Sequence, residues 1–322
     1  MKVAIVGATG VVGETILRVL EERKVPAAEV GRFASRERDG VRATSDEALA
    51  PYDVVFFASS EDASERYVPA IAARGGIAID NSSTYRMRDG VPLVVPEVNP
   101  DAATPEQRIY PVANCTAIVL CVALAPIRDA AGLASVRVAT YQAASGAGRA
   151  GLDELLAGER ALASGEAEPS NAVFPANLAR NVVPQVGAFD DDGWSGEERK
   201  VAEETRKMLG LPDLRVSATA VRVPVRTAHS EAIFVETERP TSVEALAAAF
   251  ARAPGVVYHP RGIVTPRDVE GTDLVHVARL RDEDGEGRRF ALWAVGDQLR
   301  KGAATNAVQI LELLAAKGYV GA

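Results

Sequence analysis

The chain has 322 residues, of which 47% are hydrophobic, 25% are charged and 5% are aromatic. This composition is typical of a globular protein, and at about 150 residues per domain the length favours two domains. The 36 basic and 44 acidic side chains give a formal net charge of −8, which argues against a general binder of nucleic acid or of anionic membranes. Small anions can still be bound in local basic pockets.

Hydrophobic runs and cysteine usage indicate a soluble protein. The longest nearly uncharged apolar run, Thr116–Ile127, is shorter than the roughly 20 residues that cross a bilayer, and the N-terminus lacks a signal-peptide cleavage pattern. Two cysteines, Cys115 and Cys121, are too few for a disulfide framework and lack the partners of a zinc site. We therefore expect a cytoplasmic protein with no metal site.

The first part of the chain alternates predicted strands with predicted helices. The strands are Lys2–Val6, Val30–Ala34, Asp53–Ala58, Ile77–Asp80 and Leu93–Val95, and the helices are Glu14–Arg23, Asp46–Ala50 and Ala63–Arg74. Such alternation predicts a parallel sheet with helices on both faces, which is a Rossmann-type doubly wound α/β fold. We place this domain at residues 1–115.

Near Cys115 the pattern changes, and an apolar helix is predicted to run to about Ala131. The later strands are Ser135–Gln142, Val216–Val225, Glu231–Glu236, Leu274–Leu280 and Arg289–Val295, and the later helices are Leu152–Leu162, Ser195–Leu209 and Arg300–Ala316. We expect residues 116–299 to form an α+β domain with a mixed, largely antiparallel sheet. The C-terminal helix, 300–322, is expected to return to the first domain and complete it.

A glycine turn with the spacing G-x-x-G-x-x-G joins the first strand to the first helix. Its residues are Gly7, Thr9, Gly10, Val11, Val12 and Gly13. Glycines at such a turn let backbone N–H groups approach a pyrophosphate at the helix N-terminus. The alternative is an ordinary tight turn, but the strand before it and the helix after it favour dinucleotide binding.

The residues after the second strand bear on the choice of cofactor. An NAD site places an acidic residue there to accept from the ribose hydroxyls, whereas this chain has Ser35 and Arg36. A hydroxyl and a guanidinium suit a 2′-phosphate, so we expect NADP. Glu37 follows directly, and the alternative is a solvated arginine loop.

Cys115 and His229 are the candidate reactive groups. Cys115 lies at a predicted helix start, where the helix dipole favours a thiolate; the alternative is a small buried hydrophobe, which we expect of Cys121. His229 lies in a short polar bend between two apolar strands, where we expect an exposed but held side chain; a lone histidine there is more often a surface residue.

A dinucleotide domain, a thiol and an imidazole together describe acylating aldehyde oxidation. Sulfur adds to a carbonyl, hydride passes between the nicotinamide and the thiohemiacetal, and a thioester forms. Proton management by a histidine contributes about 10²- to 10⁴-fold to such a reaction.

Several longer stretches, in this order along the chain, resemble the aspartate-β-semialdehyde dehydrogenase family. They are Gly7–Gly13, Asp80–Met87, Val95–Asn99, Asn114–Thr116, Tyr141–Gly148, Arg222–Val225, His229–Glu231 and Asp297–Ala304. The resemblance implies NADPH-dependent reductive dephosphorylation of L-aspartyl-4-phosphate to L-aspartate-4-semialdehyde and phosphate, a step toward lysine, methionine and threonine. It also implies an NADP-binding first domain, a catalytic and dimerisation second domain, and a homodimer.

The resemblance carries site roles onto matching positions. Cys115 would be the nucleophile and His229 the acid/base. Arg86, Asn114 and Lys200 would cradle the phosphate, Arg222 and Glu197 would hold the α-carboxylate and α-ammonium, and Gln142 would orient the acyl centre. Ser145, Gly146 and Gln298 would face the nicotinamide half of the cofactor, and Ser35 and Arg36 its 2′-phosphate.

Structural alternatives exist for several of these residues. Glu197 and Lys200 lie three apart on a helix with a Ser195/Glu198 capping box, so they fit an exposed ion pair equally well. Arg86 fits a loop brace, and Arg222 in its strand fits a solvent-facing side chain.

The chain departs from the family pattern at a few positions. Ala228 replaces the usual glycine before the histidine, Ala113 replaces the usual proline before Asn114, and Arg36-Glu37 is shifted from the usual arginine placement. The first two changes leave the chemistry intact, whereas the third bears on NADP against NAD.

Two rival functions follow from the same residues. An N-acetyl-γ-glutamyl-phosphate reductase shares the architecture and the thiol, but its substrate has no free ammonium for Glu197, and Thr116-Ala117-Ile118 replaces that family's Tyr-Pro-Thr run. A non-catalytic dinucleotide-binding sensor would keep the fold but would not need Cys115 and His229.

Overall fold

The protein is described by a computed structural model that covers residues 1–38 and 40–321. It divides into two compact units, one of Met1–Asn114 with Gly302–Ala322 and the other of Cys115–Lys301. Asp39 and Ala322 fall within the predicted first domain but lie outside the described residues.

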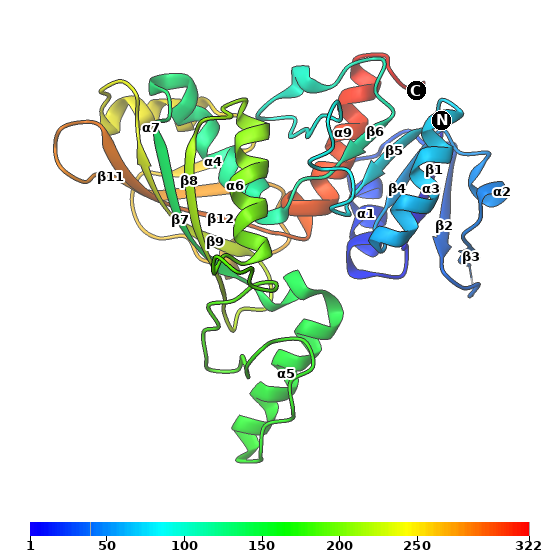
Figure 1. Ribbon diagram of the computed structural model, residues 1–322, viewed down its shortest axis with the longest axis horizontal. Coiled ribbons are helices and arrows are strands. Elements are labelled where there is room, and N and C mark those ends of the chain that lie inside the picture. Colours follow the sequence, from blue (N-terminus) through cyan, green and yellow to red (C-terminus); the bar gives the residue numbers. More distant parts are fainter. Residues whose placement is uncertain (39, 322) are drawn as a thin grey trace. The chain divides into compact units, whose positions relative to one another are not determined.

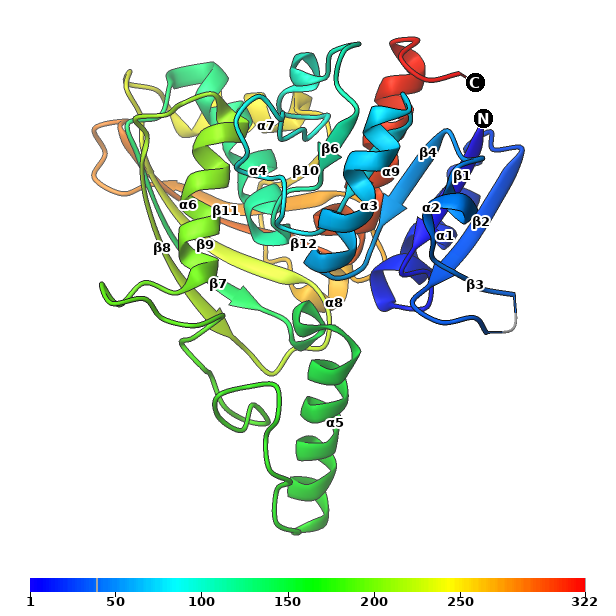
Figure 2. The same ribbon diagram turned by 45° about the vertical axis from the view of Figure 1, so that its right-hand side comes forward.

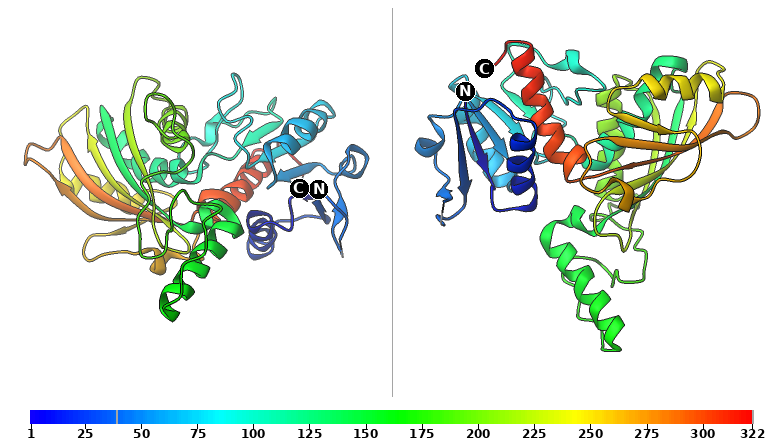
Figure 3. Two further views of the ribbon diagram at one scale, coloured as in Figure 1. Left: turned by 60° about the horizontal axis from the view of Figure 1, so that its bottom comes forward. Right: turned by 180° about the vertical axis from the view of Figure 1, so that it is seen from behind.

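The first unit contains a six-stranded parallel sheet in the order β3-β2-β1-β4-β5-β6. Its strands are β1 (Lys2–Val6), β2 (Glu29–Ala34), β3 (Arg42–Ala43), β4 (Val54–Phe57), β5 (Ile77–Asp80) and β6 (Ile109–Pro111). Its helices are α1 (Val11–Glu22), α2 (Asp46–Leu49), α3 (Glu61–Ala73) and α9 (Thr305–Ala316), with a short 3-10 turn at Pro100–Ala102. The views of Figures 1 and 3 place α1 and α3 on opposite faces of this sheet. The predicted doubly wound fold is confirmed.

The central strands of this sheet are apolar on both faces because helices cover both, whereas β2 and β3 have exposed residues. Every residue of β4 and of β5 is buried, and β4 reads VVFF without alternation. Continuous apolar runs of this kind are typical of parallel strands between two helical layers. Helix α9 contacts both α1 and β5 although it comes from the far end of the chain.

One predicted strand of this unit is wrong. Leu93–Val95 is buried but joins no sheet, and the sixth strand is β6, which the sequence analysis did not predict. The Asn99 side chain replaces the strand partner: its Oδ1 accepts from the Val95 N–H at 2.8 Å, and its Nδ2 donates to the Leu93 carbonyl at 2.9 Å. An apolar run therefore satisfies its backbone without a neighbouring strand.

The second unit contains a mixed six-stranded sheet in the order β10-β11-β12-β9-β7-β8. Its strands are β7 (Ser135–Gln142), β8 (Arg215–Arg222), β9 (His229–Glu236), β10 (Val256–His259), β11 (Val275–Asp282) and β12 (Arg289–Gly296). Its helices are α4 (Cys115–Ala131), α5 (Gly148–Ser164), α6 (Gly196–Leu209), α7 (Val243–Arg252) and α8 (Pro266–Val269), with a 3-10 turn at Ala144–Ala147 and a π-helical turn at Arg300–Ala304. Pairs β7–β8 and β10–β11 are parallel and the others are antiparallel, so the predicted mixed sheet is confirmed.

The long helices α4, α6 and α7 cover one face of this second sheet, and the short helix α8 packs against β12 on the opposite face. Helix α4 packs against α6, α7 and the sheet, and Figure 2 shows α6 running along β8. Along β7 the side chains alternate between buried and more exposed positions, as expected for a sheet with one covered face. We call the helix-covered side the inner face and the opposite side the outer face.

Helix α4 is nearly all apolar because it lies in the middle of this layer. Thirteen of its 17 residues are buried. Among residues 1–38 and 40–321, no helix has both the length and the apolar character needed to cross a bilayer.

The predicted start of α6 is confirmed. The Ser195 side chain accepts from the Glu198 N–H, and the Glu198 side chain accepts from the Ser195 N–H, which together form a capping box. This motif satisfies two N–H groups that a helix start otherwise leaves unpaired.

Candidate active site

Cys115 is the first residue of α4 and lies at the positive end of its dipole. Its side chain is half-buried, and its Sγ lies 4.0 Å from the hydroxyl of Thr116. The positive end of a helix dipole favours a negatively charged sulfur. Cys121 lies in the middle of the same helix and is fully buried, and burial raises the pKa of its thiol, so it is an inert core residue.

His229 is not in an exposed bend, as the sequence analysis expected; it is the first residue of β9 and is fully buried. The turn of the chain is taken by Ala228, whose φ of 71° lies in the left-handed region. Only glycine adopts this φ without strain, so the alanine here is held by the surrounding structure. The strand therefore begins two residues earlier than expected and places the imidazole on the inner face.

The backbone of Ala143 fixes the His229 ring. The Ala143 N–H donates to Nδ1 at 3.0 Å, so the neutral ring carries its proton on Nε2. That Nε2 is buried, and no atom of the described residues forms a hydrogen bond with it. Burial and then the charge of Arg222 lower the pKa of His229 to about 3.

Arg222 faces inward and not toward solvent, which corrects one alternative from the sequence. Its side chain is buried, its Nη1 donates to the Ala143 carbonyl at 2.7 Å, and its guanidinium lies 5.7 Å from the ring centre of Phe174. Burial lowers the pKa of Arg222, and the charges of Cys115 and Glu197 partly oppose that effect. The backbone N–H and carbonyl of one residue, Ala143, therefore hold the imidazole and the guanidinium.

Gly146 packs against these two groups. A Cβ at this position would lie 2.8 Å from Arg222 Nη1 and 3.2 Å from His229 Nε2. Real Cβ atoms essentially never approach as closely as the first of these distances, so a side chain at Gly146 would displace the guanidinium. A glycine at this position therefore lets both side chains keep their places.

Gln142 and Glu197 meet on the inner face. Gln142 Nε2 donates to Glu197 Oε1 at 2.9 Å, and Gln142 Oε1 accepts from Thr140 at 3.1 Å. The Thr116 hydroxyl also donates to Glu197 Oε1, at 3.5 Å. The sequence analysis missed both threonines, although Thr140 lies two residues before Gln142 on one strand, a spacing that places both on the same face.

Lys200 lies one turn further along α6 than Glu197, and its side chain is exposed. Glu197 is half-buried, and its carboxylate is taken up by the inner-face donors described above. The alternative that Glu197 and Lys200 form an exposed ion pair therefore does not fit Glu197.

Ser145 and Gln298 are brought together beside this cluster. Gln298 Nε2 donates to the Ser145 hydroxyl at 2.6 Å, and Gln298 Oε1 accepts from the Ala228 N–H at 2.6 Å. The Ser145 hydroxyl donates in turn to the Arg226 carbonyl at 2.5 Å. These bonds join the segment after β7 to the segments before β9 and after β12.

In the first unit, the glycine turn is a close-packed backbone loop. A Cβ on Gly7, whose φ is 85°, would lie 2.2 Å from the Ala58 carbonyl oxygen, and one on Gly13 would lie 2.2 Å from the Gly7 oxygen. Gly10 caps α1 without a side-chain hydrogen bond, so the first N–H groups of the helix have no capping side chain. Such a turn fits a pyrophosphate.

The end of β2 adjoins this turn. The N–H groups of Gly7 and Ala8 both donate to the Phe33 carbonyl, at 2.9 and 3.0 Å. Ser35 and Arg36 follow the strand directly, and both side chains are exposed. Their position beside the glycine turn fits contact with the ribose end of a dinucleotide.

Arg86 belongs to a loop that is fixed by a buried carboxylate. Asp80 accepts from the Ser64 hydroxyl at 2.9 Å and from the Ser82 N–H and hydroxyl at 2.9 and 2.7 Å. Burial raises the pKa of Asp80, although these hydrogen bonds and the charge of Arg86 oppose the shift. Arg86 Nη2 donates to the Asn81 carbonyl at 2.9 Å, so it does brace its own loop.

Asn114 is buried and is the last residue of the first unit before the unit boundary at Cys115. The two residues are therefore held next to each other by the chain itself. This adjacency is the basis for expecting the amide and the thiol to act on one reactant.

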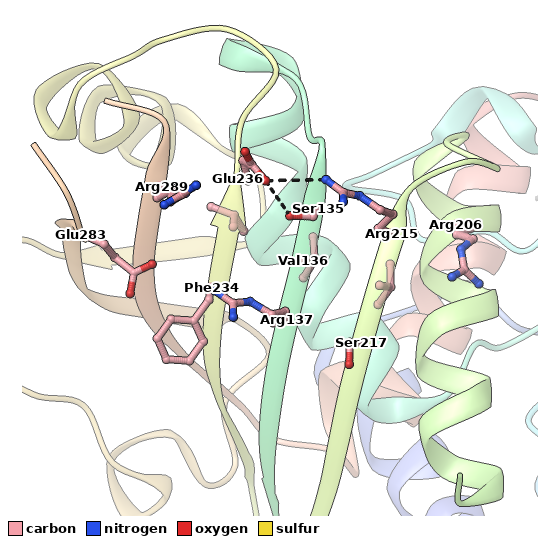
Figure 4. A pocket seen from close by; sticks show the side chains of 12 residues that line it. Ser135, Val136, Arg137, Arg206, Arg215, Ser217, Phe234, Glu236, Glu283 and Arg289 are labelled. Atoms are coloured by element: carbon pink, nitrogen blue, oxygen red, sulfur yellow. Dashed lines mark hydrogen bonds and ion pairs between the residues drawn. The ribbon is translucent and has the colours of Figure 1, made fainter. Parts of the chain in front are cut away.

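A separate hollow of about 690 Å³ lies on the outer face of the second sheet. Figure 4 shows its side chains, which come from β7, β8, β9, α6 and the β11–β12 hairpin. Arg137, Arg206, Arg215 and Arg289 line it together with Glu236, which pairs with Arg215 at 3.7 Å. None of the predicted catalytic or substrate-binding residues lines this hollow.

Comparison with known proteins finds the same similarity in both units. The family description "semialdehyde dehydrogenase, NAD binding domain" matches residues 2–105, and "semialdehyde dehydrogenase, dimerisation domain" matches residues 124–301. An aspartate-semialdehyde dehydrogenase of Aquifex aeolicus is 41% identical, with 99% of each chain covered. Aspartate semialdehyde dehydrogenase II of Vibrio cholerae, whose crystal structure is known alone and complexed with ASA, is 39% identical with a TM-score of 0.92 and 98% of both chains covered.

Proposed function

The chain belongs to the aspartate-semialdehyde dehydrogenase family, and on that premise we propose that it reduces L-aspartyl-4-phosphate to L-aspartate-4-semialdehyde and phosphate with NADPH, reversibly. Membership makes it an oxidoreductase with a dinucleotide-binding domain. The observation that carries the specific reaction is the backbone of Ala143, whose N–H and carbonyl hold His229 and Arg222 on the inner face, where Arg222 also interacts electrostatically with Cys115.

The proposed reaction passes through a thioester on Cys115. The sulfur forms a bond to the acyl carbon, the bond from that carbon to the phosphate oxygen breaks, and phosphate leaves with the electron pair. When bound, NADPH supplies the hydride that reduces the thioester. Return of the electron pair to sulfur then releases the aldehyde and restores the Cys115 thiolate. The helix N-terminus and the Arg222 guanidinium favour that thiolate.

His229 acts from its Nε2–H. Because the Ala143 N–H occupies Nδ1, the neutral ring offers a donor to the carbonyl oxygen that gains negative charge when sulfur adds. The low pKa, about 3, keeps this donor neutral near neutral pH. Its role as acid/base is therefore to give a proton, or a strong hydrogen bond, to the developing oxyanion.

Two groups grip the amino-acid end of the substrate in this proposal. The Arg222 guanidinium binds the α-carboxylate with two hydrogen bonds, and the Glu197 carboxylate binds the α-ammonium. Both are on the inner face, and Gln142, which bonds to Glu197, orients the acyl centre. Arg86, Asn114 and Lys200 hold the phosphate.

The cofactor contacts follow from the two glycine-containing segments. Gly7, Thr9, Gly10, Val11, Val12 and Gly13 hold the pyrophosphate of NADP, Ser35 and Arg36 hold the 2′-phosphate, and Ser145, Gly146 and Gln298 face the nicotinamide half. Two features support this assignment: the N-cap residue of α1, Gly10, makes no side-chain hydrogen bond to the helix, and the backbone of the glycine turn is closely packed. The hydroxyl and guanidinium after β2 favour NADP over NAD.

We also propose a homodimer formed through the outer face of the second sheet, in a cytoplasmic enzyme that serves lysine, methionine and threonine synthesis. The long helices of this unit leave this face open, and only part of β12 is covered there by the short helix α8. Tyr141 on this face is 37% exposed, and its ring centre lies 5.4 Å from that of Trp293. Exposed aromatic side chains on a sheet face are typical of interfaces. In this proposal the first unit, with its C-terminal helix, is the NADP-binding domain and the second is the catalytic and dimerisation domain.

The test is phosphate-dependent reduction of NADP by aspartate semialdehyde, followed by absorbance. We expect turnover with the wild-type chain and none with Cys115→Ala, whereas Cys121→Ala should keep its activity. Full activity in Cys115→Ala would refute the mechanism. Equal rates with the N-acetylglutamyl homologue would instead support the N-acetyl-γ-glutamyl-phosphate reductase reading.

A further inference from the structure

Strand β8 is an edge strand of the second sheet. The backbone groups that point away from its neighbour β7 have no strand to pair with, so they need other hydrogen-bond partners. Its N–H groups alternate between those that face β7 and those that face away. Two that face away are bonded: the Arg222 N–H donates to the Val183 carbonyl at 2.8 Å, and the Ala220 N–H donates to Glu198 Oε1 at 2.9 Å. The second of these bonds comes from a side chain on α6.

Glu198 makes a second bond of the same kind at its other oxygen. Its Oε2 accepts from the Ser195 N–H at 2.8 Å, and the Glu198 N–H donates to the Ser195 hydroxyl oxygen at 3.3 Å. The Glu198 side chain is buried. One buried carboxylate therefore ties the start of α6 to the middle of β8.

The two elements that Glu198 joins carry the two groups that grip the substrate. Glu197 is its immediate neighbour on α6, and Arg222 lies two residues after Ala220 on β8. We propose that Glu198 is a positioning residue that fixes the Glu197 carboxylate relative to the Arg222 guanidinium and so sets how tightly the site holds an α-amino acid head. This inference rests on the proposed function.

The geometry requires a carboxylate at this position. Its two oxygens face two N–H donors, and only an acid offers an acceptor to both. In Glu198→Gln the amide NH₂ would face one of these donors, so one bond would be lost and the first turn of α6 would move relative to β8. Displacements of about 1 Å between substrate-positioning groups can cost about 10²-fold in rate.

The test compares Glu198→Gln with Glu203→Gln, a change of the same kind at an exposed position of the same helix. For Glu198→Gln we expect KM for aspartate semialdehyde to rise by about tenfold or more, with kcat changed by less than about threefold. 4-Oxobutanoate lacks the amino group. The ratio of kcat/KM for aspartate semialdehyde to kcat/KM for 4-oxobutanoate should fall by the same factor as KM rises. Glu203→Gln should match wild type.

A simple loss of folded protein would lower kcat and leave KM and this preference unchanged, which would overturn the proposal. Ser195→Ala gives a second check, because it removes the hydroxyl of the capping box but leaves both carboxylate bonds of Glu198. We expect KM near wild type for that variant. A rise as large as in Glu198→Gln would mean that general loosening of α6 is responsible, and would also overturn the proposal.

Hydrogen exchange separates this inference from the proposed function. The Ala220 amide should be protected in the wild-type chain and in Glu203→Gln, and should exchange much faster in Glu198→Gln. If the wild-type chain showed no activity toward aspartate semialdehyde, the proposed function would fail, and this amide would still report whether the tie between α6 and β8 exists. Equal protection in all three proteins would contradict the tie.

Discussion

The two faces of the second sheet are built from alternate residues of the same strands, yet they differ in almost every physical respect. On the inner face, Thr140, Gln142 and His229 are buried and bonded at defined atoms. On the outer face, Arg137 is exposed and Tyr141 partly so, beside an open hollow. A period of two residues along these strands is enough to separate the proposed reaction site from the proposed dimer surface.

The largest expected change in kcat comes from removing the His229 imidazole on the inner face. His229→Ala should lower kcat by about 10²- to 10⁴-fold, because a group that donates to the developing oxyanion is lost. His229→Gln, which keeps a side-chain N–H donor, should lose less. Steady-state kinetics of the two variants measure the difference, and equal losses would argue against a donor role.

The pH profile sharpens the same point. With a pKa of about 3 in place of the usual 6.5, His229 stays neutral from pH 5 to 9. The plot of kcat/KM against pH should therefore have no inflection near pH 6.5 that is caused by His229. Wild type and His229→Gln should have profiles of the same shape in that region. Such an inflection, absent only from the variant, would mean that the imidazolium form is the working state.

A smaller effect is expected from Glu231, which lies on the inner face two residues after His229. It is fully buried, burial raises its pKa well above 4.5, and neither carboxyl oxygen has a hydrogen-bond partner within the described part of the chain. Above pH 4.5 the Glu231 carboxyl stays protonated in the folded state but loses its proton in the unfolded state. Its stabilising contribution is therefore present below pH 4.5 and is lost as pH rises, by at most about 1.4 kcal/mol per pH unit.

Urea unfolding of Glu231→Gln checks this sign. The variant cannot ionise, so its stability relative to wild type should increase between pH 4.5 and pH 8. Glu203→Gln, at an exposed position, is the control and should show no such trend. A stability difference that stays constant with pH would show that Glu231 ionises normally in the folded protein.

The smallest effect on chemistry is expected on the outer face. Phe234→Glu places a charge in the outer hollow and should shift the mass measured by light scattering from dimer toward monomer. A surface substitution away from the catalytic residues usually changes the free energy of unfolding by no more than about 0.5 kcal/mol. The kcat of the protein that remains dimeric should therefore stay within about twofold of wild type. A dimer unaffected by this change would place the interface elsewhere.

Local signals in the sequence were enough for the elements that carry the site. The glycine turn after β1, the capping box of α6 and the cysteine at the start of α4 each depend on residues within a few positions of one another. The secondary structure confirms all three. The strand pattern is predicted in part: the parallel first sheet and the mixed second sheet are confirmed, but β3, β6 and β10 are not predicted from local signals.

The rest depends on contacts between distant segments, which local patterns do not contain. The inward turn of Arg222 follows from its bond to Ala143, 79 residues away, and His229 is buried through a bond spanning 86 residues. Leu93–Val95 reads as a strand but is satisfied by the Asn99 side chain. Tertiary partners decided each of these cases.

Trapping the covalent intermediate tests the central claim most directly. Wild-type protein mixed with NADP and aspartate semialdehyde, without phosphate, should form NADPH in a burst equal to the number of sites. Acid quenching and peptide mass spectrometry should then find an aspartyl group on the peptide bearing Cys115, and Cys121 unmodified. NADPH formation with no acyl group on Cys115 would contradict the account.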